Sequence, residues 1–168
     1  MQTTNKCLDL RWIDFLNEDQ CAEIITRYNN LAMLDNLEEE KRKCKIFPFN
    51  PAEVDKLPQA LYEANNIFYE FDLSKNIECY FGRYDENDHF NTWHIDSNIV
   101  SEQRKLSFSI LLNNDFTGGE FETMEYGKLE KKKGRLLVFP SFYPHKVNPV
   151  TNKTRYAIFG FVLGPAWR

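Results

Sequence analysis

The chain has 168 residues, of which 42% are apolar and 27% charged, and its formal net charge at neutral pH is −4. This length suits one domain with a sizeable core and is short for two, and the composition is that of a globular protein. The acidic balance gives no general attraction to nucleic acid or to an anionic membrane, so neither is expected as a partner.

The N-terminal residues "MQTTNKCLDLRWIDFL" have no basic start followed by an apolar run, so they do not resemble a secretion signal. No later stretch approaches the roughly 18 apolar residues of a membrane-spanning helix. The cysteines are widely spaced and form no CxxC pair, which favours reduced and mostly buried thiols. They are Cys7, Cys21, Cys44 and Cys79. We therefore expect a cytoplasmic protein.

Two amphipathic helices are predicted in the first half of the chain. In "FLNEDQCAEIITRYNNL", Asn17 is followed three residues later by Gln20, the pattern of a capping box. The second helix, in "LPQALYEANNIFYEFDL", begins near Pro58. Apolar residues recur at helical spacing in both, and these stripes are expected to face the core. They consist of Cys21, Ile24, Ile25 and Tyr28, and of Leu61, Ala64, Phe68 and Phe71.

The stretch between the two helices, "DNLEEEKRKCKIFPFNPAE", crowds acidic and basic residues together before two prolines. A solvated loop is predicted there, with a mobile lid as the alternative.

From Ile77 onward the pattern changes to short strands separated by turn residues. Strands are predicted in residues 77–84, 105–113, 119–124, 134–140 and 154–163, which are rich in aromatic and branched side chains. In "KLSFSILLN" one face is apolar, whereas Ser107 and Ser109 make the other partly polar, as inside a ligand-holding barrel. Helices followed by antiparallel strands indicate an α+β chain, mainly β, whose β part is a sandwich or small barrel.

The histidines are few, and their placement is informative. They are His89, His94 and His145. In "WHID", His94 and Asp96 are two residues apart, so in an extended segment both side chains point to the same face. His145 follows a predicted strand some fifty residues later. Two histidines and one carboxylate form the facial triad of non-haem Fe(II) oxygenases, although an isolated HxD is also common in turns.

A candidate anchor for an anionic ligand follows the last histidine. Arg155 lies ten residues beyond His145, at the start of a predicted strand. Its planar guanidinium is always charged and matches a carboxylate, which suits a dicarboxylic co-substrate. Taken alone, it would be interpreted as an ordinary surface arginine.

Together, "WHID", "FTGGEFE" and "KKGRLLVFPSFYPHKVNPVTNKTRYAIFGF" resemble the Fe(II)/2-oxoglutarate-dependent dioxygenases, and most of all their prolyl 4-hydroxylase-like branch. The resemblance covers roughly residues 77–163. It implies a double-stranded β-helix (jelly-roll, cupin-like) core in residues 77–168. Residues 1–76 are expected to give mainly helical support within a single domain, 1–168.

The resemblance also implies roles for individual residues. His94, Asp96 and His145 would be the iron ligands and catalytic residues, and Arg155 would hold the distal carboxylate of 2-oxoglutarate. A tyrosine before HxD often contacts this co-substrate, and both Tyr84 and Tyr80 are candidates, with Tyr84 favoured by position. Phe90 stands near a point where relatives often have a second tyrosine. Trp93 is interpreted as a pocket wall or as a packed core aromatic.

The implied activity is hydroxylation of a C–H bond with Fe(II), 2-oxoglutarate and O2, and with release of succinate and CO2. Ascorbate is a further cofactor that the resemblance allows. The implied substrate is a prolyl residue of a peptide or protein; a free amino acid or another small metabolite is the alternative. A non-catalytic jelly-roll module that binds a metal, or a cupin-like zinc or manganese protein, would share the pattern. The basic stretch "KLEKKKGR" is interpreted as a solvated hairpin rather than a nucleic-acid patch.

Overall fold

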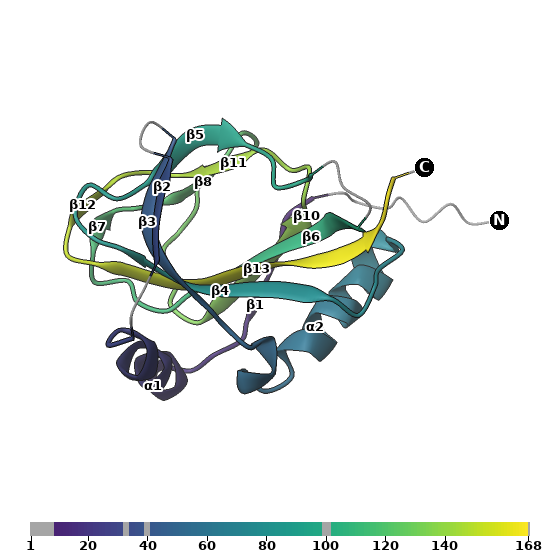
Figure 1. Ribbon diagram of the computed structural model, residues 1–168, viewed down its shortest axis with the longest axis horizontal. Coiled ribbons are helices and arrows are strands. Elements are labelled where there is room, and N and C mark those ends of the chain that lie inside the picture. Colours follow the sequence, from purple (N-terminus) through teal and green to yellow (C-terminus); the bar gives the residue numbers. More distant parts are fainter. Residues whose placement is uncertain (1–8, 32–33, 39–40, 99–101, 168) are drawn as a thin grey trace.

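The structure, a computed structural model, describes residues 9–31, 34–38, 41–98 and 102–167. Two antiparallel sheets face each other, as predicted for a jelly roll. The main sheet has the order β1-β10-β6-β13-β4-β3-β2, and the smaller sheet has the order β5-β11-β8-β9. In Figure 1 the helices α1 and α2 lie on the side of the main sheet that faces away from the smaller sheet.

The strands of the main sheet are Arg11–Asp14 (β1), Leu34–Glu38 (β2), Arg42–Pro48 (β3), Ile77–Tyr84 (β4), Glu102–Leu111 (β6), Arg135–Pro140 (β10) and Arg155–Pro165 (β13). The smaller sheet consists of Phe90–His94 (β5), Phe121–Thr123 (β8), Gly127–Lys128 (β9) and His145–Val147 (β11). Thr117–Gly118 (β7) and Val150–Asn152 (β12) form a separate two-stranded ribbon. The strands predicted from Ile77 onward are therefore confirmed, with small shifts at their ends.

Both predicted helices are present. The first is Glu18–Tyr28 (α1), and its capping box is formed: the Asn17 side chain accepts from the Gln20 amide, and the Gln20 side chain accepts from the Asn17 amide. The second is Leu57–Ala64 (α2), which continues as a π-helical turn, Asn65–Tyr69. A short 3₁₀ turn, Pro51–Glu53, precedes it. Among the described residues, no helix is long and apolar enough to cross a membrane.

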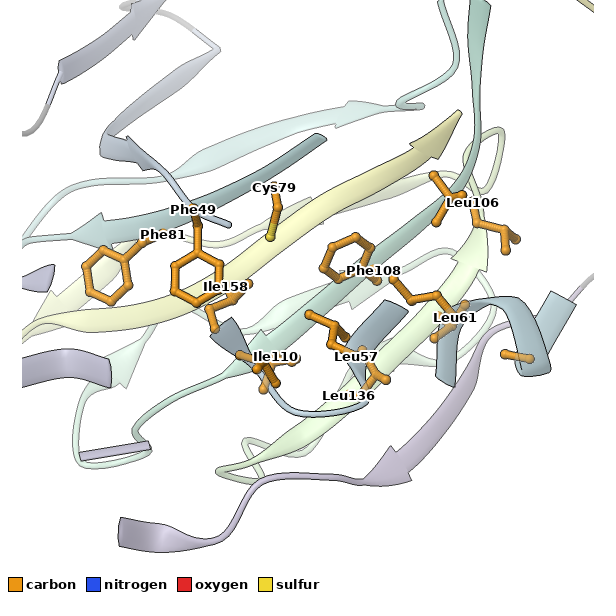
Figure 2. Packing of buried hydrophobic residues seen from close by; sticks show 14 of the residues in the cluster. Phe49, Leu57, Leu61, Cys79, Phe81, Leu106, Phe108, Ile110, Leu136 and Ile158 are labelled. Atoms are coloured by element: carbon orange, nitrogen blue, oxygen red, sulfur yellow. The ribbon is translucent and has the colours of Figure 1, made fainter. Parts of the chain in front are cut away.

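The hydrophobic core lies between the helices and the main sheet. Leu57 and Leu61 of α2 meet side chains of β6 and β10 there, including Phe108 and Leu136, and all four are at most 1% exposed (Figure 2). The predicted apolar stripes of both helices belong to this cluster. Cys21, Cys44 and Cys79 are free and buried, as expected, whereas Cys7 lies outside the described residues. Because this core fills one face of the main sheet, the other face is left to the site.

The prediction of a solvated loop before the second helix is wrong. Residues 34–38 form β2 and residues 42–48 form β3, and β3 pairs with β4 toward the edge of the main sheet. Side chains alternate along β3, so that Cys44 is buried while Lys43 and Lys45 form ion pairs with Asp88 and Asp85. Pairing with a distant strand thus outweighed the local charge pattern. Residues 1–76 are accordingly less helical than expected, because they contribute three strands to the main sheet.

The basic stretch 128–135 is a crossing between the two sheets rather than a hairpin. It links β9 of the smaller sheet to β10 of the main sheet. Lys131 donates to the backbone carbonyls of Phe116 and Gly118, and Lys132 forms an ion pair with Asp14. These lysines therefore hold neighbouring segments of the fold together.

Candidate metal centre

Three possible metal ligands converge between the two sheets. His94 ends β5, Asp96 follows it, and His145 begins β11 directly opposite His94 in the antiparallel pair. The Nε2 atom of His94 lies 3.7 Å from one carboxylate oxygen of Asp96, and the Nε2 atom of His145 lies 3.4 Å from the other. One ligand atom from each residue lies within 4.8 Å of those of the other two. The structure therefore brings together the three residues singled out in the sequence.

Backbone carbonyls fix the orientation of both imidazoles. The Nδ1 atom of His94 is 2.8 Å from the carbonyl oxygen of Thr92, and that of His145 is 2.9 Å from the carbonyl oxygen of Tyr143. A carbonyl can only accept, so each Nδ1 carries the proton and each Nε2 lone pair is directed toward the cluster. Burial, together with the nearby His145, lowers the pKa of His94 to about 4. The ring is thus in its neutral, metal-binding form near pH 7.

Aromatic rings pack against the two imidazoles. Phe90 stacks on His94 with ring centroids 3.5 Å apart and an interplanar angle of 11°. Phe121 stacks on His145 at 5.1 Å, and Phe139 contacts the same ring edge to face at 4.9 Å. These contacts restrict the imidazoles and shield the cluster from water. At the position where relatives often have a tyrosine, Phe90 therefore has a packing role.

Two serines orient the carboxylate of Asp96. The hydroxyl of Ser107 donates to Asp96 Oδ2 at 2.7 Å and lies 3.0 Å from the hydroxyl of Ser141. The Asp96 amide in turn donates to the Ser141 carbonyl at 2.7 Å. Sequence reasoning assigned neither serine to the site, although Ser107 belongs to the polar strand face it recognised. For Ser141 the sequence offered no signal.

Arg155 lies in the same space, on β13, and is only 4% exposed. It pairs in register with Tyr84 of β4, and its guanidinium carbon lies 5.0 Å from the centre of the tyrosine ring. Nε of Arg155 is buried without a hydrogen-bond partner, and no carboxylate of the described residues pairs with this side chain. Burial lowers the pKa of Arg155 and raises that of Tyr84, so the phenol keeps its proton. An unpaired buried cation of this kind fits an anionic ligand.

The other candidates lie outside this space. Tyr80 stacks on Phe159 at 5.6 Å and does not line the pocket, so the structure favours Tyr84. Trp93 is 39% exposed and contacts Lys146 on the outer face of the smaller sheet. Both interpretations of Trp93 are therefore wrong, because alternation along β5 turns it away from the side on which His94 lies. His89 is also absent from the ligand cluster.

The pocket between the sheets is lined mostly by aromatic and aliphatic side chains. Besides the three possible metal ligands, its polar side chains are those of Arg42, Tyr84, Ser109 and Arg155. Arg42 belongs to β3 and was not recognised in the sequence, because that segment was expected to be a loop. An apolar lining with a few convergent polar groups is typical of a small-molecule site.

Comparison with known proteins agrees with this geometry. Residues 79–163, about half of the chain, match the sequence model of the 2OG-Fe(II) oxygenase superfamily. A PKHD-type hydroxylase of Idiomarina loihiensis is 36% identical over 87 residues, which cover 48% of this chain and 39% of the relative. A PKHD-type hydroxylase of Prochlorococcus marinus (strain MIT 9301) is 36% identical over 106 residues, which cover 59% of this chain and 47% of the relative. The matched region thus spans less than half the length of these curated relatives.

Solved structures share the fold over nearly the whole chain. A prolyl-4-hydroxylase of Pseudomonas putida superposes with a TM-score of 0.75 and 22% identity, covering 94% of this chain and 93% of that one. The viral collagen prolyl hydroxylase of Paramecium Bursaria Chlorella virus-1, in its 2OG complex, superposes with a TM-score of 0.73 and 20% identity. The match covers 92% of this chain and 96% of that one. At these identities the likeness concerns the jelly-roll fold.

Proposed function

Because the chain belongs to the 2OG-Fe(II) oxygenase superfamily, we propose that it is an Fe(II)- and 2-oxoglutarate-dependent hydroxylase. Its proposed substrate is a prolyl residue of a peptide or protein. One observation carries the proposal: the buried guanidinium of Arg155, which has no carboxylate partner among the described residues, shares a pocket with His94, Asp96 and His145. A dicarboxylate beside a metal would satisfy both halves of this arrangement.

The side chains present fit the implied cofactors. Iron(II) would be held by His94, Asp96 and His145, and with 2-oxoglutarate and O2 it supplies an oxidation that puts one oxygen atom into the substrate and one into succinate, with release of CO2. Arg155 would bind the distal carboxylate of 2-oxoglutarate, and the protonated phenol of Tyr84 would donate a hydrogen bond beside it. The stacked rings of Phe90 and Phe121 would exclude bulk water from the reacting groups.

The prolyl substrate rests on similarity. Structures with this fold include the two prolyl hydroxylases described above and one from Trichoplax adhaerens bound to a peptide fragment of hypoxia inducible factor, with a TM-score of 0.71 and 20% identity. Fold alone does not fix a substrate. Mass spectrometry of peptides incubated with enzyme, iron and 2-oxoglutarate, with and without ascorbate, would identify the residue that gains one oxygen atom.

The cofactor assignment is tested spectroscopically. Anaerobic addition of Fe(II) and 2-oxoglutarate should give the weak visible charge-transfer band of the chelate, and Asp96→Ala should abolish it. Arg155→Gln should leave metal binding intact but weaken the binding of 2-oxoglutarate by roughly 30-fold or more. The reason is that the loss of one partner of a buried charge pair costs about 2–5 kcal/mol. Arg27→Gln, on the exposed side of α1, is the matched control.

Two results would contradict the proposal. If folded wild-type protein bound iron but gave no band with 2-oxoglutarate, the chain would be a metal-binding module rather than an oxygenase of this kind. If Arg155→Gln bound 2-oxoglutarate as tightly as wild type, the anchor would have to lie elsewhere.

A further inference from the structure

A second arginine lines the pocket from the edge of the main sheet. Arg42 begins β3, and its guanidinium carbon lies 5.1 Å from the ring centre of Phe90 and 5.3 Å from that of Phe159. Phe90 in turn stacks on His94, so one phenyl ring contacts both the guanidinium of Arg42 and the imidazole of His94. The Nε of Arg42 donates to Cys44 Sγ at 3.3 Å, which fixes the side chain along its own strand. Arg42 is therefore held on the His94 side of the pocket.

Among the side chains that the structure describes, which begin at Lys41 in this part of the chain, no carboxylate pairs with Arg42, in contrast to its basic neighbours. Lys43 pairs with Asp88 at 3.3 Å, and Lys45 and Arg83 pair with Asp85 at 2.9 and 2.8 Å. Arg42 is half-buried between two aromatic rings. A partly desolvated guanidinium without a counter-ion is costly unless a ligand completes it.

The charges in the pocket leave Arg42 unmatched even with the proposed cofactors bound. The two positive charges of iron(II) would balance the two negative charges of 2-oxoglutarate, and the negative charge of Asp96 would balance the positive charge of Arg155. One positive charge then remains, on Arg42, in a largely apolar space. Arg155 is the more deeply buried of the two arginines, which suits a co-substrate enclosed in the pocket. This leaves Arg42 for a different anion.

We propose that Arg42 binds a carboxylate of the substrate, close to the carbon that is hydroxylated, so that the enzyme selects anionic substrates. This inference rests on the proposed function. The carboxylate can have two sources: the α-carboxylate of a free amino acid or chain terminus, or an acidic side chain next to the target residue. A guanidinium presents the same planar fork to both.

The first test compares turnover of matched probes. N-acetyl-L-proline differs from N-acetyl-L-prolinamide only in its carboxylate, and the peptide amides acetyl-Asp-Pro-Gly and acetyl-Asn-Pro-Gly differ only in the side chain. Wild type should prefer the acid of one pair by about ten- to a hundredfold, as expected for a hydrogen bond to a charged group. Arg42→Gln should lose that preference, Arg42→Lys should retain part of it, and Lys41→Gln, an exposed neighbour, should not change it.

The second test needs no turnover and no knowledge of the substrate. In protein loaded with Zn(II) and saturated with 2-oxoglutarate, the side-chain Nε–H resonance of Arg42, assigned by its loss in Arg42→Gln, should move on titration with acetate and not with acetamide. If 2-oxoglutarate itself moved this resonance and acetate then had no effect, Arg42 would serve the co-substrate and the inference would be overturned. No response to either anion would also overturn it.

The two tests separate the inference from the proposed function. If acetate moved the Arg42 resonance but none of the proline probes was hydroxylated, the anion site would be supported and prolyl hydroxylation would be rejected. If the wild-type enzyme hydroxylated the probes but did not prefer the acids, prolyl hydroxylation would be supported and the proposed binding of a substrate carboxylate by Arg42 would be overturned.

Discussion

Removing the hydroxyl of Ser107 tests how the carboxylate of Asp96 is held. Ser107 lies 1% exposed on β6, and its hydroxyl donates to Asp96 Oδ2 at 2.7 Å. Ser107→Ala deletes this bond and leaves the carboxylate free to rotate about its side-chain axis. Loss of a partner that orients a metal ligand typically weakens metal binding by about 10- to 100-fold. That range corresponds to roughly 1.4–2.8 kcal/mol, similar to the value of one hydrogen bond to a charged group.

The assay for Ser107→Ala is an anaerobic Fe(II) titration followed through the charge-transfer band at saturating 2-oxoglutarate. Ser109→Ala is the matched control, because Ser109 lies two residues along the same strand face and lines the pocket, and no hydrogen bond joins it to Asp96. We expect Ser107→Ala to bind iron at least about tenfold more weakly and the Ser109 variant to match wild type. Equal affinities for the two variants would refute the orienting role of Ser107.

Two further predictions concern the framework. Leu61→Ala, at a fully buried position of α2, should destabilise the fold by about 2–5 kcal/mol in urea unfolding while leaving iron affinity unchanged, because this core lies across the main sheet from the site. The Asp85 carboxylate accepts from Lys45, Arg83 and Thr154. Burial opposes ionisation there, but these bonds outweigh it and lower the pKa of Asp85. The ionised Asp85 therefore stabilises the fold fully above pH 3.8, the ordinary pKa of this carboxyl. This stabilisation is lost as the pH falls through the lower pKa of the folded state. Asp85→Asn should cost roughly 1–2 kcal/mol at neutral pH and less near pH 3; a pH-independent cost would contradict this.

Where local patterns agreed with tertiary packing, the sequence was a sufficient guide. The strand predicted over residues 77–84 has the same bounds in the structure, because its alternating side chains fit both of its neighbouring strands. The capping box at Asn17 needs only residues within one helical turn. The partly polar face of β6 was also interpreted correctly, since Ser107 and Ser109 both face the pocket side.

The misinterpretations have a common physical origin in long-range pairing. Charged residues and prolines around β3 are typical of a loop, yet that strand is stabilised by β4 and by carboxylates some forty residues away, as in the pair of Lys45 with Asp85. Arg42 was missed for the same reason. Tyr80 and Tyr84 have the same parity on one strand, and only the register of β4 with β13 places Tyr84, not Tyr80, beside Arg155.

The candidate metal centre depends on strand register more than on any local motif. His145 faces His94 because β11, a strand of three residues, pairs with β5 on one side and with β8 on the other. A shift by one residue would set Lys146 opposite His94 and turn His145 to the outer face. On the β8 side His145 pairs with Thr123, whose hydroxyl accepts from the Tyr126 amide at 3.0 Å in the turn toward β9. His94 and Asp96 thus meet a third possible metal ligand only when a short strand some fifty residues away is held in one register, and nothing within "WHID" specifies that register.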